Sequence, residues 1–485
     1  MRNPMNPYLI RPLSKLGTIA TACACLLSHL PILAASDEPR PLFIEGYANQ
    51  LSLAPGEKVA FHISTSAAKF SMEIARVGAE RKVVWRTNNI VGAEYPVPEN
   101  ASSHGCKWPA AFTLSIPANW RSGYYAAKLS VSDRGGKYVQ RNARTAESEL
   151  FFIVRPANPG NDTKILLQLC ANTYNAYNNW GGSSLYGYHG RAKLQGNRVS
   201  FDRPLSGQFY RWEASFVKWA EQNGYQLDFA VNSDLEFRPE ILKNYRLVLS
   251  IGHDEYWSAP MRDNLERFIR DGGNVAFLSG NSVCWQVRSE DDGRALTCWK
   301  QNYNSDPIFQ TREYANLSSL WSHHLVKRPE NQLTGVGFLF GGYHKSHGQY
   351  MDGSGAFIVH RPDHWLFAGT DLKRGDEFGG KNTIVGYECD GCEMTWKDGL
   401  PYPTHRDGTP KSFEILCTAP AKWHPDDSEW YERWEKGHTG NAVVGVYQNG
   451  GTVVTTGTTD WADGLKGGDK TVDRITRNIL DRLRK

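Results

Sequence analysis

A histidine and a glutamate separated by one residue are the side chains of this sequence best suited to act together on a substrate. His253 and Glu255 follow the apolar run 247–251, which is typical of a strand buried in a parallel sheet. Alternate residues of an extended segment face the same side, so we expect His253 and Glu255 to point together, and Asp254 and Tyr256 to point away. The pair could act as acid and base, or Glu255 could bind a metal ion with His253 in support.

A structural role is the alternative for both residues. Glu255 would then cap a helix that begins near Ser258, and His253 would only fill space. Polar side chains after two further predicted strands argue against this alternative, because residues 172–179 follow the strand 165–169 and Asn281 follows the strand 274–278. Open α/β sheets bind ligands at the carboxyl ends of their strands, so the sequence predicts a site at that edge.

The residue types at this edge favour a hard metal ion over a protein nucleophile. No Ser or Cys stands in the turn after 251, where a hydrolase with a nucleophile elbow would carry it. The available groups are oxygen donors, namely the Glu255 carboxylate and phenols such as Tyr177, which suit a ferric ion better than zinc or copper. A bound metal would also lower the pKa of a phenol from its usual value of about 10.

Two predicted domains contain the elements that position these groups. Short segments of alternating polarity over 41–155 predict an immunoglobulin-like β-sandwich, and a linker follows it. In the second domain, 163–485, strands alternate with helices as far as Asn281, which predicts an α/β fold with a doubly wound parallel sheet and β-rich additions after it. We expect 171–198 to be a long polar and aromatic loop and 383–387 to be a strand.

The first 35 residues have the pattern of an export signal. Basic residues precede the apolar run 17–35, and a polar segment follows it. A membrane anchor is the alternative, but His29 and Pro31 interrupt a run that is already short for a membrane span. We therefore expect removal of the signal peptide 1–35 and a periplasmic or extracellular protein.

Cleavage would leave seven of the nine cysteines, and in an exported protein these are candidates for disulfides. The preferred pairs are Cys284 with Cys298, and Cys389 with either Cys392 or Cys417. The spacing of Cys389 and Cys392 could instead form half of a zinc site, but no second motif of this kind accompanies it. A cysteine nucleophile is a further alternative, although no evident base flanks one.

The overall charge excludes some classes of partner. The net charge is only +4 over 485 residues, and no cluster of Lys and Arg interleaves with aromatic residues. Nucleic acids and acidic membrane surfaces are therefore poor candidates for partners.

A set of motifs extends from about Phe43 to the C-terminus. It comprises GHDEYWS and FLSGN around the central strands, AYNNWGG at 176–182, FYRWEASFVKWAEQNGYQLDF, RPEN at 328–331 and GTTDWADGL at 457–465. Together these motifs resemble the large (beta) subunit family of N,N-dimethylformamidase. The resemblance implies a sandwich-like domain ahead of a glutamine-amidotransferase-like (flavodoxin-like) α/β domain.

The resemblance further implies an amide hydrolase with a mononuclear iron, Fe³⁺, held by two tyrosines and one glutamate. The glutamate of the family motif falls on Glu255 and one tyrosine falls on Tyr177. The other tyrosine, from a Ser-Gly-x-Tyr element, falls on Tyr125, next to Tyr124. With Tyr125 as a ligand, the iron would lie at the interface of the two domains.

Three further residues carry the implied catalytic roles. His253 and Glu388 would transfer protons, and Asn281 would hydrogen-bond to the developing oxyanion. The chain departs from the family pattern at Asp254, where a proline is usual, which bears on the substrate. The expected partner is a small amide substrate, with a homo-oligomer possible; the alternative function is a non-catalytic exported protein that binds carbohydrate or peptide.

Overall fold

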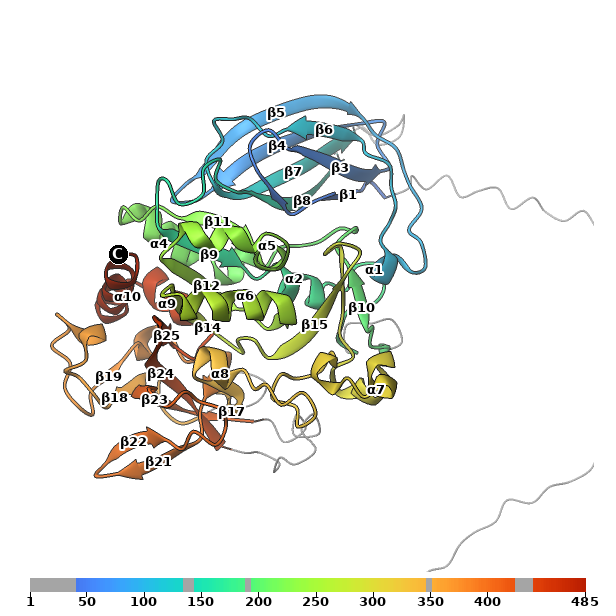
Figure 1. Cartoon of the computed structure of the whole chain (residues 1–485). Coiled ribbons are helices and arrows are strands. Elements are labelled where there is room, and N and C mark those ends of the chain that lie inside the picture. The colour runs from blue at the N-terminus through green and yellow to red at the C-terminus, as the bar shows by residue number, and fades with distance from the viewer. Residues whose placement is uncertain (1–40, 134–143, 188–192, 346–350, 424–438) are drawn as a thin grey trace, which may run out of the picture. The chain divides into compact units, whose positions relative to one another are not determined.

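The first part of the chain folds into two facing β-sheets. We describe the protein from a computed structural model, which places residues 41–133, 144–187, 193–345, 351–423 and 439–485. One sheet has the order β1 (Ile44–Ala48), β3 (Lys58–Thr65), β6 (Phe112–Ser115). The other has the order β2 (Ser52–Leu53), β8 (Arg144–Val154), β7 (Gly123–Asp133), β4 (Lys69–Val77), β5 (Arg81–Val91). Figure 1 shows the two sheets at its top, in blue and cyan.

A hydrophobic core separates these two sheets. Alternate residues of each strand enter it, such as Val59, Phe61 and Ile63 of β3, and Phe152 and Val154 of β8. This N-terminal β-rich region therefore has the layered arrangement that its period-two pattern predicts.

The rest of the chain is built on a large sheet of mixed direction. The strands along its main path are, in order, β11 (Asp228–Val231), β9 (Ile165–Leu169), β12 (Leu247–His253), β14 (Asn274–Gly280), β25 (Gly451–Thr455), β24 (Thr439–Asn449), β23 (Glu414–Lys422), β17 (Gly337–Tyr343) and β20 (Glu388–Gly391). Two short strands, β18 (Phe357–Val359) and β19 (Glu377–Phe378), lie off this path; they pair with each other, and β18 also pairs with β23. Neighbours from β11 to β25 are parallel, whereas those from β25 to β20 are antiparallel. The predicted β-rich additions thus extend the same sheet.

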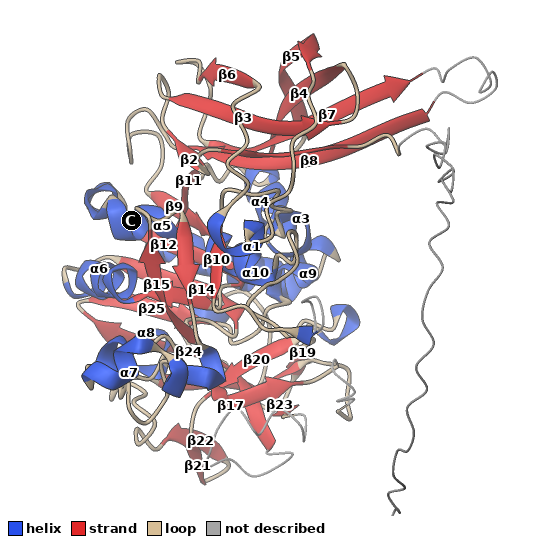
Figure 2. Ribbon diagram, turned by 90° about the vertical axis from the view of Figure 1, so that its right-hand side faces the viewer, coloured by secondary structure: helices blue, strands red, loops and turns tan. Residues whose placement is uncertain are grey.

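Helices cover both faces of the parallel strands, as Figure 2 shows. Leu249 and Ile251 of β12 contact the core that contains α4 (Ala214–Gln222) and α10 (Lys470–Leu483). The intervening Val248 belongs to the opposite core, with Met261 and Leu265 of α6 (Ala259–Arg270). A continuous apolar run is needed because this strand is buried on both sides.

The central β12–α6–β14 unit forms where the sequence predicts it. Ser258 is the N-cap of α6, and its Oγ accepts a hydrogen bond from the Met261 amide at 3.4 Å. Beyond α6, β14 pairs with β12 so that His253 lies opposite Gly280. The ends of both strands therefore meet at one edge of the sheet.

Two predictions of local structure are wrong. The segment 171–198 is not all loop, because its start forms α2 (Ala171–Tyr177), whose residues are buried up to Ala176. The segment 383–387 is not a strand; β20 begins only at Glu388, after a 3-10 turn at Gly380–Asn382. In both cases tertiary contacts outweigh the local pattern.

All seven cysteines of the described residues are buried, unpaired thiols, so the structure does not form the preferred disulfides. Cys389 and Cys392 belong to the hydrophobic cores on opposite faces of the large sheet, which explains why they do not pair. The Cys298 thiol instead donates to the carbonyl oxygens of Gln286 and Ser318.

The predicted signal peptide, 1–35, lies outside the described residues. Among the helices that are described, none combines the length and the apolar character that crossing a membrane requires. Residues Leu42–Lys485 form a single compact unit, to which both the N-terminal sheets and the large sheet belong.

Candidate functional site

His253 lies between two carboxylates at the edge of the large sheet. Its Nε2 atom is 3.2 Å from Glu255 Oε2 and 2.8 Å from Glu388 Oε2. His253 ends β12, and Glu388 begins β20, a strand far from β12 in the sequence. The three side chains are almost fully buried, with exposed fractions of 2% for His253, 2% for Glu255 and 4% for Glu388. Water therefore screens these charges little.

The close contact of these three side chains shifts the pKa values of His253 and Glu255. Burial opposes the imidazolium form, but the carboxylates of Glu388 and Glu255 outweigh burial and raise the pKa of His253 to about 10. Burial would raise the pKa of the Glu255 carboxyl, yet contact with His253 and the charge of Lys300 hold it below its usual value. At neutral pH the site thus contains a protonated imidazole beside an ionised carboxylate.

Aromatic rings surround the imidazole of His253. The rings of Tyr177, Trp212 and Tyr387 lie with centroids 5.6, 5.6 and 5.8 Å from it. Gly252 makes the approach of Trp212 possible, because it has a φ of +80° and a Cβ atom there would lie 2.4 Å from Trp212 Cβ. These rings shield the imidazole from water.

A chain of hydrogen bonds leads from a buried lysine to Glu255. Lys300 Nζ donates to Tyr256 Oη at 2.9 Å, and Tyr256 Oη donates to Tyr186 Oη at 2.7 Å. Tyr186 Oη in turn lies 2.9 and 3.1 Å from the two carboxylate oxygens of Glu255. Trp285 Nε1 also donates to Glu255, at 2.8 Å. Glu255 is therefore held from one side by a polar network.

The lysine of this chain lies among aromatic rings. Its Nζ is 3.5 Å from the ring centroid of Tyr186 and 4.5 Å from that of Trp285. Burial lowers the pKa of Lys300 to about 8, although the charge of Glu255 acts in the other direction. The rings and the nearby carboxylate both stabilise the buried ammonium.

Tyr177 joins the site through its ring. It ends α2 and packs on the Tyr186 ring at 4.3 Å between centroids. Burial, and after it the charge of Glu255, raises the pKa of the Tyr177 phenol well above its usual value. The Tyr186 phenol thus contacts the Glu255 carboxylate, and the Tyr177 ring packs against Tyr186.

The structure does not bring Tyr125 to this site. Its ring lies in the core between the two N-terminal sheets, stacked on Trp120 at 4.8 Å, and its Oη donates to the Arg121 carbonyl oxygen. The adjacent Tyr124 faces the opposite way and stacks on Phe209 at 4.0 Å. Because β7 is an extended strand, its neighbouring side chains alternate, and neither tyrosine contacts Glu255. The prediction of an iron site between two domains is corrected accordingly.

Asn281 follows β14 at the same edge. It adopts a left-handed backbone conformation with a φ of 49°. Its Oδ1 is buried and accepts no hydrogen bond from any residue that the structure describes. A Cβ atom on the preceding Gly280 would lie 2.5 Å from the Glu388 carbonyl oxygen, so Asn281 is close to the start of β20.

The orientation predicted for the HDEY segment is partly correct. His253 and Glu255 point together, and Asp254 points away to Ser250 and Asn232. Tyr256, by contrast, belongs to the hydrogen-bond chain that ends on Glu255. The reason is that β13 (Tyr256–Ser258) pairs with β15 (Trp285–Glu290) in a separate small sheet, so the chain does not continue as one extended strand.

Sequence reasoning did not identify Tyr186 or Lys300. Tyr186 lies in the same polar and aromatic stretch as Tyr177, and this stretch could have indicated a second tyrosine of the site. Lys300 follows no strand of the large sheet and belongs to the 3-10 segment Lys300–Ser305, so no local pattern marks it.

The donor set fits a hard metal ion. Among the placed residues, no group of three or more His, Cys, Asp and Glu side chains is arranged to hold a metal. The candidate donors are instead one carboxylate and two phenols, Glu255, Tyr177 and Tyr186, whose oxygens would be of the hard type that ferric iron prefers once the phenols are ionised.

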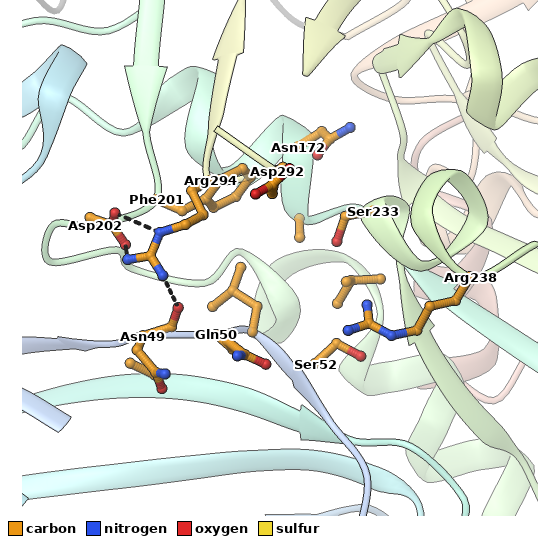
Figure 3. A pocket seen from close by; sticks show the side chains of 15 residues that line it. Asn49, Gln50, Ser52, Asn172, Phe201, Asp202, Ser233, Arg238, Asp292 and Arg294 are labelled. Atoms are coloured by element: carbon orange, nitrogen blue, oxygen red, sulfur yellow. Dashed lines mark hydrogen bonds and ion pairs between the residues drawn. The ribbon is translucent and has the colours of Figure 1, made fainter. Parts of the chain in front are cut away.

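Figure 3 shows a hollow lined in part by Asn172 of α2. It has a volume of about 230 Å³, and its lining includes Asn172, Ser52 and Arg294. Arg294 pairs with Asp202, and none of His253, Glu255 and Glu388 lines this pocket. The chemistry of the site is therefore separate from this hollow.

Comparison with known proteins gives one consistent family. Residues 71–474 match the family described as N,N-dimethylformamidase beta subunit-like, C-terminal. The N,N-dimethylformamidase beta subunit of Paracoccus aminophilus is 24% identical over 452 residues, which cover 78% of this chain and 55% of that protein. That of an Alcaligenes species is 24% identical over 226 residues, covering 38% of this chain and 28% of the relative.

The chain spans about half the length, or less, of these curated relatives. Among solved structures, the mmIFT52 N-terminal domain is 11% identical with a TM-score of 0.24, covering 54% of this chain and 86% of that one, and we draw nothing from it. The family match extends over most of the chain and includes every residue of the site around His253. The chain therefore belongs to the N,N-dimethylformamidase beta subunit-like family.

Proposed function

We propose that this protein hydrolyses the C–N bond of a small amide with the help of a mononuclear iron, Fe³⁺. The observation that carries the proposal is the buried imidazole of His253 between the carboxylates of Glu255 and Glu388, with two phenols beside Glu255. The names of the curated relatives support the same reaction class.

Glu255, Tyr177 and Tyr186 would hold the iron. This set keeps the composition of two tyrosines and one glutamate that the family resemblance implies, but replaces Tyr125 with Tyr186 on the basis of its contact with Glu255. When bound, the iron would polarise the amide carbonyl and lower the pKa of a water molecule. The charge of Lys300, transmitted through Tyr256, favours the ionised form of the oxygen donors.

His253 and Glu388 would manage the protons of the reaction. His253, in its protonated form, would give its Nε2 proton to the leaving nitrogen. Glu388, whose Oε2 lies 2.8 Å from Nε2, would stabilise the imidazolium through its charge. Asn281 would hydrogen-bond to the developing oxyanion through its side-chain amide.

We also propose the finer features of fold and location. The facing N-terminal sheets support an immunoglobulin-like sandwich over 41–155, and the two-sided parallel strands support a glutamine-amidotransferase-like, doubly wound domain over 163–485. Export to the periplasm or the exterior rests on the N-terminal pattern alone. A small amide is the proposed partner, and a homo-oligomer remains a prediction.

Amine release from a panel of simple amides, beginning with N,N-dimethylformamide, tests the proposed reaction. Iron-loaded protein should release amine, and both His253→Gln and Glu388→Gln should lower kcat by about 100-fold or more. Chelation of the iron should abolish turnover, and restored iron should recover it. An iron-loaded, folded protein that hydrolyses none of these amides would favour the binding function instead.

A further inference from the structure

The GTTDW segment, 457–461, contacts the backbone that carries Glu388. The Thr459 amide donates to the Glu388 carbonyl oxygen at 3.1 Å, and the Glu388 amide donates to Thr459 Oγ1 at 3.3 Å. Two residues further, the Asp390 amide donates to the Gly457 carbonyl oxygen at 3.0 Å. The segment therefore fixes the start of β20 from both sides of Glu388.

Asp460 completes this contact with a buried carboxylate. Its exposed fraction is 3%, and its Oδ2 accepts hydrogen bonds from the Tyr387 amide at 2.5 Å and from Thr459 Oγ1 at 3.1 Å. The residue before Tyr387 must be small, because a Cβ atom on Gly386 would lie 2.7 Å from Asp460 Oδ2. The carboxylate thus fits closely against the peptide just ahead of Glu388.

Arg211 holds Asp460 from the solvent side. Its Nη2 donates to Asp460 Oδ1 at 2.7 Å, and half of its side chain is exposed. The Arg211 guanidinium also lies 4.1 Å from the ring centroid of Trp212. Trp212 in turn contacts both His253 and Tyr387. Arg211 therefore contacts two residues that pack around the site, Asp460 and Trp212.

We propose that Asp460 is a positioning residue, which fixes the Tyr387 backbone so that the Glu388 carboxylate meets His253, and that Arg211 fixes Asp460 in turn. The inference rests on the proposed function, in which Glu388 and His253 manage the protons. Asp460 itself touches neither the imidazole nor a substrate. Its effect is on alignment, which proton transfer requires within fractions of an ångström.

Steady-state kinetics on N,N-dimethylformamide with the full chain, loaded with iron, test the alignment. Asp460→Ala should lower kcat by about 10- to 100-fold with little change in KM, because substrate binding does not involve this residue. Asp460→Asn keeps an acceptor for the Tyr387 amide and should recover part of the loss. On the exposed side, Arg211→Lys should stay closer to the wild type than Arg211→Ala.

Glu221→Gln is the matched control. Glu221 also accepts a backbone amide, that of Ala79, and pairs with an arginine, Arg76, but it belongs to α4, and none of its contacts with described residues involves the site. Its kcat should equal that of the wild type. Equal losses in Asp460→Ala and Glu221→Gln, each matching the loss of folded protein, would reduce Asp460 to a structural role and overturn the proposal.

Crystal structures of the same variants give a readout that does not need activity. In Asp460→Ala the distance between Glu388 Oε2 and His253 Nε2, 2.8 Å in the native chain, should grow beyond hydrogen-bonding range, and it should be unchanged in Glu221→Gln. If the wild type hydrolyses no amide, the proposed function fails, and this distance alone decides the inference. An unchanged distance in Asp460→Ala would contradict it.

Discussion

At the scale of single residues, the site is defined by what surrounds Glu255. Its carboxylate contacts the imidazole of His253, the phenol of Tyr186 and the indole of Trp285. A buried carboxylate with so many donors stays ionised, which suits it to bind a cation. In the proposed function that cation is ferric iron, because carboxylate and phenolate oxygens are hard donors.

Exchange of single tyrosines tests which phenols bind the iron. Tyr186→Phe should bind clearly less iron than the wild type and lose its visible absorption, because one of the three proposed oxygen donors is gone. Tyr125→Phe should keep both, and should lower the free energy of unfolding by only about 1 kcal/mol through loss of the hydrogen bond to Arg121. Metal analysis and unfolding of the two variants give the answer. Iron loss in Tyr125→Phe with full iron in Tyr186→Phe would reverse the assignment.

At the scale of elements, the turn from β12 into the site depends on one glycine. Gly252 has a φ of +80° and lies against Trp212. Gly272, after α6, has a φ of +96°, and a Cβ atom there would meet no atom of the described residues within 4 Å. Both glycines have a positive φ, but only Gly252 lacks space for a Cβ atom. Substitutions at the two positions can therefore be compared directly.

Alanine at these two glycines separates strain from crowding. Gly272→Ala should cost about 1 kcal/mol of unfolding free energy through the left-handed backbone alone. Gly252→Ala should cost about 2 kcal/mol more and also lower kcat, because the added methyl displaces Trp212 from the His253 ring. Denaturant unfolding and amine release measure both effects. Equal stabilities and equal rates in the two variants would show that Trp212 tolerates the methyl group.

A buried acid outside the site, Glu213, connects α2 with the start of α4. Glu213 precedes α4, and the Tyr174 phenol donates to its Oε1 at 2.5 Å. Burial raises the pKa of Glu213 to about 8, which exceeds the ordinary value of an unfolded glutamate. Between these two pKa values the folded chain keeps the proton and the unfolded chain releases it, so stability falls as pH rises through this window.

Glu213→Gln should remove this dependence. Relative to the variant, the wild type should lose unfolding free energy steadily from about pH 5 to about pH 8, because only the unfolded wild-type chain gains from ionisation there. Urea unfolding of both proteins at several pH values measures the difference. Parallel stability curves over this range would mean that Glu213 is ionised in the folded state.

The same elements show what the sequence could predict. Period-two spacing placed His253 beside Glu255, and the continuous apolar runs located β9, β12 and β14. The edge strand β5 escaped detection because its pattern is mostly exposed and polar. Helix α2 was hidden because its buried face is polar and aromatic, so it carries no apolar stripe.

At the scale of the whole molecule, the site is built from segments far apart in the sequence. Tyr177 and Tyr186 come from the region after β9, His253 and Glu255 from the end of β12, and Glu388 from β20. Only the folding of the large sheet brings β20 to the end of β14, so local patterns could not join Glu388 to His253. The family resemblance supplied that residue. The same resemblance named Tyr125 as a ligand, but the structure places Tyr125 in the core between the N-terminal sheets.

The N-terminal sheets support the site from outside it. Ser122 Oγ accepts the Phe229 amide of β11 at 2.8 Å, and Arg76 pairs with Glu221 of α4. They also supply Tyr124, which stacks on Phe209 just before Trp212. No side chain of these sheets contacts His253, Glu255 or Glu388 among the contacts of the described residues. Their contribution is therefore to hold α3 (Phe209–Trp212) and the large sheet in place.

The iron content of the purified wild-type protein, read with its visible absorption, tests the central claim most directly. Two phenols and a carboxylate around ferric iron should give about one iron per chain and a phenolate-to-iron absorption band. Protein that is folded, was produced with iron present and contains neither the metal nor the band would contradict the account.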